Sequence, residues 1–152
     1  MTDSITKIWS SEEPLQNIKK TADTIMTLIN KDKKRFSLWL EGELGAGKTT
    51  MTGELLYSLG LARGEPVLSP TYTYMNEYHI DGRWFSHMDL YRVKHKTSLE
   101  EYGISLQREY EGFFLEWAEK ILWTHDISPT HKLTINYCET DTSRQYSLFK
   151  FI

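Results

Sequence analysis

Residues 42–49 constrain this 152-residue chain more than any other segment, because they match the pattern G-x-x-x-x-G-K-S/T in full. The segment reads Gly42, Glu43, Leu44, Gly45, Ala46, Gly47, Lys48 and Thr49. Glycines allow the backbone to curl so that successive amide groups point at phosphate oxygens, and the positive end of a following helix adds to the attraction. In this pattern Lys48 neutralises β- and γ-phosphates, and the Thr49 hydroxyl ligates Mg²⁺. The motif therefore predicts nucleoside triphosphate binding.

The sequence on either side of the loop has the context that the motif requires. Residues 36–40 are largely apolar, as expected of a short central strand that is covered on both faces. After the loop, apolar residues recur at helical spacing from Met51 to Leu59, and Gly60 ends the pattern. A strand, a loop and a helix in this order predict an α/β fold of the P-loop NTPase type.

Helices are also expected outside this unit. Ser10 and Glu13 fit a capping box, a proline follows in the first turn, and apolar residues continue at helical spacing to Ile29. We therefore expect a helix that opens at Ser10. Further helical segments are expected at residues 99–111 and 119–123.

Short apolar or alternating runs predict the remaining strands. They lie at residues 71–74, 77–80, 84–88, 112–115, 132–137 and 146–151. The dipeptide Asp81-Gly82 is a strong turn signal, and residues 141–143 join the last two strands into an antiparallel hairpin. Together the elements predict a three-layer α/β fold with a mixed, largely parallel central sheet and a C-terminal β-hairpin, in one domain over residues 1–152.

Composition narrows the class of protein. Hydrophobic residues make up 39% and charged residues 26%, as in ordinary globular domains, and the net charge of −3 argues against a dedicated nucleic-acid binder. Cys138 is the single cysteine, so neither an intrachain disulfide nor a cysteine-based zinc site is expected. The sequence has neither a secretory signal nor an apolar run of about 20 residues. A cytoplasmic protein without a membrane segment is expected.

Two acidic residues end apolar strands and are candidates for the acidic group that P-loop enzymes place near Mg²⁺. Asp89 follows residues 84–88, and Glu116 follows residues 112–115. In open α/β folds ligands bind at the carboxyl ends of the strands. Either residue alone also fits a solvated strand end. The spacing does not distinguish the direct metal ligand from the residue that holds or activates water.

Other residues have both a functional and an ordinary interpretation. Thr71 lies about 20 residues beyond the loop, where switch threonines sense a γ-phosphate in other NTPases, but it also fits a strand threonine after a proline. Trp117 is typical of a core aromatic. His87 fits an ordinary strand histidine better than it fits a catalytic base, which is the alternative. Arg92 and Arg144 have the reach to contact phosphates, although isolated arginines usually face water.

The sequence allows more than one nucleotide base and more than one fate for the γ-phosphate. Residues 30–33 do not form the Asn-Lys-x-Asp motif that selects guanine in small GTPases, so adenine is favoured. A small-molecule kinase is an alternative, but its arginine-rich lid has no counterpart among the scattered arginines. A nucleotide-gated binding module without intrinsic hydrolysis is another alternative.

Four segments together resemble the TsaE (YjeE) family in their order and spacing. They are residues 42–50, 69–73, 87–92 and 116–117. The resemblance runs from Trp9 to Arg144 and implies a bacterial, Mg-dependent ATPase that supports threonylcarbamoyladenosine formation in tRNA. In this family the TsaD and TsaB proteins transfer the carbamoyl group, and TsaE binds their complex and hydrolyses ATP. Contact of this chain with tRNA is then indirect or weak.

The resemblance also implies roles for individual residues. ATP or ADP would be contacted by Glu12, Glu43, Leu44, Gly45, Ala46, Gly47, Lys48, Thr49, Thr50, Trp117 and Arg144. The expected catalytic residues are Lys48, Thr71, Asp89 and Glu116, and the expected Mg²⁺ ligands are Thr49, Asp89 and Glu116. Glu12 would lie by the adenine, and Thr71 would be the switch residue. Met88 and Glu43 depart from the family's common phenylalanine and aspartate without replacing a functional residue.

Overall fold

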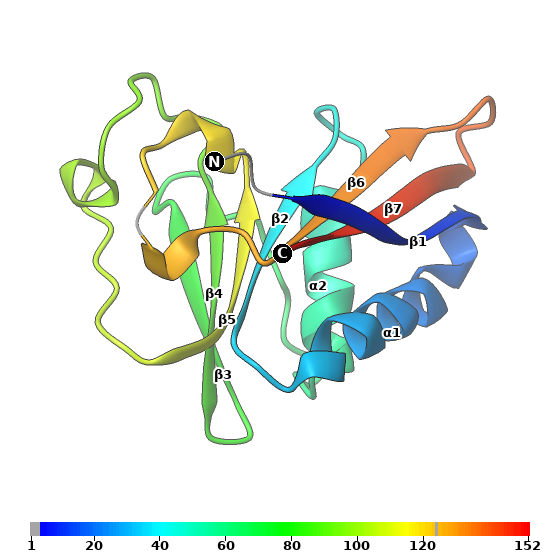
Figure 1. The fold of residues 1–152 in the computed structure, drawn as a ribbon, viewed down its shortest axis with the longest axis horizontal. Coiled ribbons are helices and arrows are strands. Elements are labelled where there is room, and N and C mark those ends of the chain that lie inside the picture. Colours follow the sequence, from blue (N-terminus) through cyan, green and yellow to red (C-terminus); the bar gives the residue numbers. More distant parts are fainter. Residues whose placement is uncertain (1–3, 124) are drawn as a thin grey trace.

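A seven-stranded mixed sheet forms the centre of the computed structural model, which describes residues 4–123 and 125–152 (Figure 1). The strands are β1 (Ile5–Pro14), β2 (Phe36–Glu41), β3 (Met75–Ile80), β4 (Arg83–Asp89), β5 (Tyr110–Glu116), β6 (His131–Tyr137) and β7 (Ser143–Phe151). Their spatial order is β1-β7-β6-β2-β5-β4-β3. The middle strands β6, β2, β5 and β4 run parallel, and antiparallel pairs form both edges. The mixed sheet and the C-terminal hairpin are confirmed.

Helices α1 (Ile18–Ile29) and α2 (Lys48–Ser58) pack against each other and share one hydrophobic core with the sheet (Figure 1). Helix α1 presents a single buried stripe that includes Ala22, Ile25, Met26 and Ile29. A second core lies on the opposite face, under η3 (Leu99–Tyr102), η4 (Ala118–Lys120), η5 (His125–Ile127) and their loops. The third layer therefore consists of 3-10 turns rather than long helices. Among the described residues, no helix is both long and apolar enough to cross a membrane.

The expectation of a helix that opens at Ser10 is wrong, because this segment is part of β1. Ser10 pairs with Ser147 on β7, and the hydroxyl oxygens of these two residues lie 3.0 Å apart. Pro14 pairs with Ser143 on the same strand. The helical region begins only at Leu15, in a 3-10 turn before α1. A capping box supplies two hydrogen bonds, and a nine-residue register with β7 provides more.

Two further expectations from local pattern are wrong. In residues 99–111 the helical part is limited to the turn η3, because Gly103 adopts a left-handed conformation (φ +75°) that ends it, and the range closes with the start of β5 at Tyr110. Residues 71–74 form turns instead of a strand. The helical turn expected at residues 119–123 lies slightly earlier, in η4. The other expected strands are present with small changes in their boundaries.

Candidate functional site

The loop between β2 and α2 depends on glycine at three positions. Gly45 and Gly47 have φ angles of +82° and +110°, which side chains other than glycine rarely adopt. At Gly42 a Cβ atom would lie 2.6 Å from the carbonyl oxygen of Ile135 on β6, so a side chain has no room there. The loop can therefore approach the sheet closely and turn directly into the N-terminus of α2 at Lys48.

The Lys48 side chain lies folded into this loop and is 5% exposed. Its Nζ donates hydrogen bonds to the carbonyl oxygens of Gly42 (2.6 Å) and Glu43 (3.0 Å) and lies 4.6 Å from the centre of the Trp117 ring. Burial lowers the pKa of Lys48, and the nearby carboxylates of Glu116 and Asp89 oppose this shift. A buried ammonium held by neutral carbonyls is a favourable place for an anionic ligand.

The two acidic candidates lie side by side at the carboxyl ends of parallel strands. Asp89 on β4 is opposite Glu116 on β5, and Glu116 is also opposite Leu40 on β2, just before the loop. Both carboxylates are buried, with 8% and 3% exposure. The structure thus brings together the loop and both acids, as the sequence predicts for this edge of the sheet.

Glu116 is linked to α2 through Thr49. The Thr49 hydroxyl donates to the carboxylate and lies 3.0 Å from each of its oxygens. On the other side, His87 Nε2 lies 2.6 Å from Glu116 Oε2. The sequence predicts Thr49 and Glu116 as site residues, whereas for His87 it favours a strand histidine over a catalytic base; the position of His87 two residues before Asp89 is the available signal.

Asp89 is linked instead to the segment that contains Thr71. Ser69 Oγ donates a hydrogen bond to Asp89 Oδ2. Thr71 Oγ1 in turn donates a hydrogen bond to Ser69 Oγ at 3.1 Å. The backbone N–H of Tyr91 donates to the other carboxylate oxygen of Asp89 at 3.0 Å. Ser69 therefore connects Thr71 with Asp89. It was missed as a site residue, although it belongs to the segment that resembles the family.

These side chains surround a cavity of about 400 Å³. Its lining comprises Leu44, Gly45, Gly47, Lys48, Thr49, Thr50, Ser69, Thr71, Asp89, Tyr91, Glu116 and Trp117. Larger hollows exist on the molecule, including one of about 490 Å³ at the other end of β2, but this cavity combines a buried lysine with two buried carboxylates. Trp117 (φ +59°) forms one wall, with its ring 5.1 Å from that of Tyr91.

The oxygen donors of this cavity fit Mg²⁺ in company with phosphate. No group of three or more His, Cys, Asp or Glu side chains in the described residues is arranged to hold a metal ion. Mg²⁺ usually takes only one or two carboxylates and completes its shell with phosphate oxygens and water. The adjacent Thr49 hydroxyl and Glu116 carboxylate supply oxygen ligands of that kind.

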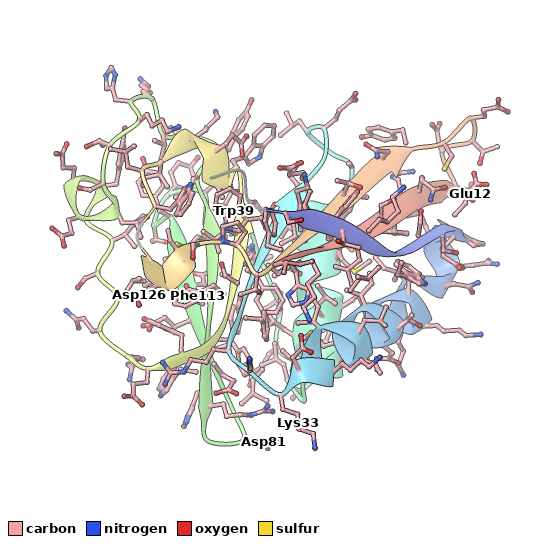
Figure 2. The ribbon with its side chains drawn as sticks, viewed as in Figure 1. Glu12, Lys33, Trp39, Asp81, Phe113 and Asp126 are labelled. Carbon is pink, nitrogen blue, oxygen red and sulfur yellow. The ribbon has the colours of Figure 1, made fainter. Side chains whose placement is uncertain are left out.

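Four of the residues expected near the nucleotide lie outside the cavity lining: Glu43 and Ala46 of the loop itself, and the more distant Glu12 and Arg144. Arg144 on β7 is 8% exposed and donates to the carbonyl oxygens of Ala46 (3.1 Å), Asp141 (3.0 Å) and Ser143 (2.8 Å). It therefore braces the loop from behind instead of facing water. Glu12 is exposed near the C-terminal end of β1 (Figure 2). It lines a shallow hollow together with Cys138, and a hydrogen bond to the Glu12 carboxylate raises the pKa of the Cys138 thiol.

The substitution Arg144→Met is expected to lower the free energy of unfolding by about 2–4 kcal/mol, because it leaves three backbone carbonyls without their donor. Urea denaturation measures this change. The exposed Arg92 offers a matched control, and Arg92→Met is expected to change stability by less than about 0.5 kcal/mol. Equal stability of the two variants would show that Arg144 does not brace the loop.

Comparisons with known proteins identify the family of this chain. The model of the family described as "Threonylcarbamoyl adenosine biosynthesis protein TsaE" matches residues 13–146. The tRNA threonylcarbamoyladenosine biosynthesis protein TsaE of Haemophilus influenzae is 37% identical over 134 residues, which is 86% of this chain and 78% of the relative. The Aquifex aeolicus protein of the same name is 36% identical over 109 residues, 71% of this chain and 74% of the relative.

The structural comparison points the same way. The crystal structure of Bacillus subtilis YdiB superposes with a TM-score of 0.61 and 25% sequence identity, covering 99% of this chain and 88% of that one. The α/β fold is thus shared along nearly the whole chain. Since the family model also covers most of the sequence, this chain belongs to the TsaE family, whose proteins take part in tRNA threonylcarbamoyladenosine biosynthesis.

Proposed function

We propose that this chain binds ATP with Mg²⁺ in the cavity beside the Gly42–Thr49 loop and hydrolyses it to ADP and phosphate. The hydrolysis supports threonylcarbamoyladenosine formation on tRNA by a TsaD–TsaB complex. The proposal depends on one observation: Lys48, Thr49 and two buried carboxylates line the same cavity, next to a glycine-rich loop. Family membership supplies the tRNA pathway.

Each residue of the cavity has a distinct task in this reaction. Lys48 exchanges its two carbonyl partners for phosphate oxygens, and Thr49 and Glu116 hold Mg²⁺. When bound, the metal neutralises negative charge on the phosphate oxygens. The oxygen of a water molecule bonds to the γ-phosphorus while the bond from that phosphorus to the bridging oxygen breaks, ADP leaves with the bridging oxygen, and the proton lost by the water passes to the released phosphate or to solvent.

Asp89 orients the attacking water. One of its oxygens accepts from Ser69 and the other from the Tyr91 amide, which fixes the carboxylate in place. Each carboxylate oxygen has a second lone pair, so Asp89 can still accept a hydrogen bond from water. Trp117 limits the access of bulk solvent to Lys48.

The reconstituted reaction tests the proposal. The purified partner proteins that form and transfer the threonylcarbamoyl group, TsaD and TsaB among them, are incubated with tRNA, threonine, bicarbonate and ATP, with and without this chain, and modified tRNA and free phosphate are measured. Repeated rounds of modification with release of free phosphate are expected only when the chain is present. Phosphate transfer to an organic acceptor would identify a kinase instead, and unchanged modification would reject the role in the pathway.

Binding of partners controlled by the nucleotide is a second candidate function, favoured by the chain of hydrogen bonds from Thr71 through Ser69 to Asp89. Leu68 and Tyr72, on either side of this segment, expose 66% and 83% of their surface. If the nucleotide moved this segment, the exposed apolar surface of these two side chains, and with it the affinity for a partner, would change. This function is compatible with hydrolysis.

The substitution Thr71→Val tests the control by nucleotide, because valine keeps the shape of threonine and removes the donor to Ser69. The affinity for a TsaD–TsaB complex is measured with ATP and with ADP. In the wild type the two affinities are expected to differ by about 5–150-fold, and in the variant by less than about twofold. The exposed Thr73, replaced by valine, is the control and is expected to keep the difference. A full difference in the Thr71 variant would exclude Thr71 as the sensor.

In this proposal the chain acts in the cytoplasm and contacts tRNA indirectly or weakly. Its net charge of −3 is unfavourable for dense phosphate contacts, so the partner proteins hold most of the tRNA.

A further inference from the structure

His87 is a fully buried polar side chain that the proposed reaction does not yet use. It lies on β4 with 0% exposure, and its Nε2 is 2.6 Å from Glu116 Oε2. The other ring nitrogen, Nδ1, is buried and has no hydrogen-bond partner. The contact with Glu116 is therefore the polar interaction that compensates for burying this ring.

The register of the sheet places His87 beneath the site. On β4 and β5, Asp89 is opposite Glu116, and His87 is opposite Phe114. Side chains two residues apart in a strand share a face, so His87, Asp89 and Glu116 all project toward the side that carries α2. His87 thus reaches Glu116 from the interior, whereas Thr49 reaches it from α2.

The chemistry of the acceptor fixes the direction of this hydrogen bond. A glutamate that ligates a metal is ionised and only accepts, so in the metal-bound site His87 donates through Nε2. Glu116 Oε2 is held by the His87 ring, which comes from a central strand, and the Thr49 hydroxyl lies 3.0 Å from both Oε1 and Oε2. His87 therefore contacts one oxygen of the carboxylate only, and Oε1 is the oxygen that it does not hold.

We propose that His87 is a positioning residue that orients the Glu116 carboxylate toward Mg²⁺. This inference rests on the proposed function, because it assumes a metal between Glu116 and phosphate. Partners that hydrogen-bond to a metal-ligating side chain typically contribute 10–100-fold to metal affinity. His87 touches neither metal nor nucleotide, so its effect passes entirely through Glu116.

Two amide substitutions separate positioning from packing. In His87→Gln the amide nitrogen reaches the place of Nε2 and can still donate to Glu116. In His87→Asn the shorter side chain puts the amide near the place of Nδ1, which has no partner. Both variants bury one amide in place of the ring, so they form a matched pair.

The measurement uses Mn²⁺ as the probe for the metal site. Binding of Mn²⁺ to the ADP-saturated protein is titrated by the electron paramagnetic resonance of free Mn²⁺, and ADP binding without metal is measured by calorimetry in EDTA. We expect His87→Asn to weaken Mn²⁺ binding by about 10–100-fold and to leave metal-free ADP binding within about twofold of the wild type. We expect His87→Gln to retain Mn²⁺ affinity within about threefold.

Three results would overturn the inference alone: wild-type Mn²⁺ affinity in His87→Asn, an equal loss of Mn²⁺ and metal-free ADP binding in that variant, or a His87→Gln variant as weak as His87→Asn. The second result would assign His87 to packing, and the third would show that the donor does not matter. A wild-type protein that binds neither ADP nor Mn²⁺ would reject the proposed function and this inference with it.

Discussion

The substitution Lys48→Ala is expected to weaken Mg-ATP binding by at least about 100-fold and to leave the protein folded. Lys48 presents two hydrogen bonds that it now gives to the carbonyls of Gly42 and Glu43, and a bound nucleotide would receive them at its phosphates. A hydrogen bond to a charged group contributes about 1.5–3 kcal/mol, and 1.4 kcal/mol is tenfold in Kd. Two such bonds account for the expected loss.

Calorimetric titration with ATP and Mg²⁺ measures this effect, and the urea midpoint checks the fold. Lys132→Ala is a suitable control, because Lys132 is a partly buried lysine that lies 3.7 Å from Glu41, outside the cavity lining. It should bind Mg-ATP within about twofold of the wild type, as surface ion pairs contribute little. If the Lys48 variant bound Mg-ATP like the control, the loop would not be the nucleotide site.

The parts of the site that the sequence predicts well are those set by local geometry. Gly45 and Gly47 occupy backbone conformations that favour glycine, so the motif specifies the turn from β2 into α2. Asp89 and Glu116 end apolar strands that run parallel to β2, and parallel strands bring their carboxyl ends to one edge. Placing these acids required only that the strands be recognised.

The parts that sequence reasoning missed depend on contacts between distant segments. The helix expected at Ser10 gives way to a strand because β7, more than 130 residues later, offers a pairing partner. The contacts of Ser69 with Asp89 and of His87 with Glu116 also join different segments, 20 and 29 residues apart. Polar residues in a strand or loop carry no local signal that names such a partner.

Arg144 illustrates the same limit at the level of a single side chain. Its resemblance to an arginine near the nucleotide placed it by the ligand, whereas all of its described hydrogen bonds go to backbone carbonyls. It acts on the loop through Ala46, and neither residue belongs to the cavity lining. These contacts show how Arg144 supports the loop, and its contact with the nucleotide stays a prediction.

The substitution Glu116→Gln is expected to reduce ATP hydrolysis by about 100–1,000-fold, the usual cost of losing one electrostatic stabiliser of a transition state. Glutamine keeps the size of the side chain but loses the charge that Mg²⁺ needs, and its NH₂ group faces the Thr49 or the His87 donor. Metal-free ADP should bind at least as tightly as in the wild type, because a negative charge near Lys48 and the phosphates is gone.

Phosphate release with the partner proteins present measures hydrolysis, and calorimetry in EDTA measures metal-free ADP binding. Glu119→Gln is the matched control, since Glu119 is exposed but still close enough to affect the pKa of Lys48 electrostatically. It should hydrolyse ATP within about threefold of the wild type, because an exposed charge is screened by solvent. Full hydrolysis in Glu116→Gln would show that Glu116 is not the essential carboxylate and would leave Asp89 as the candidate. Weaker metal-free ADP binding in this variant would mean that Glu116 shapes the cavity instead of holding the metal.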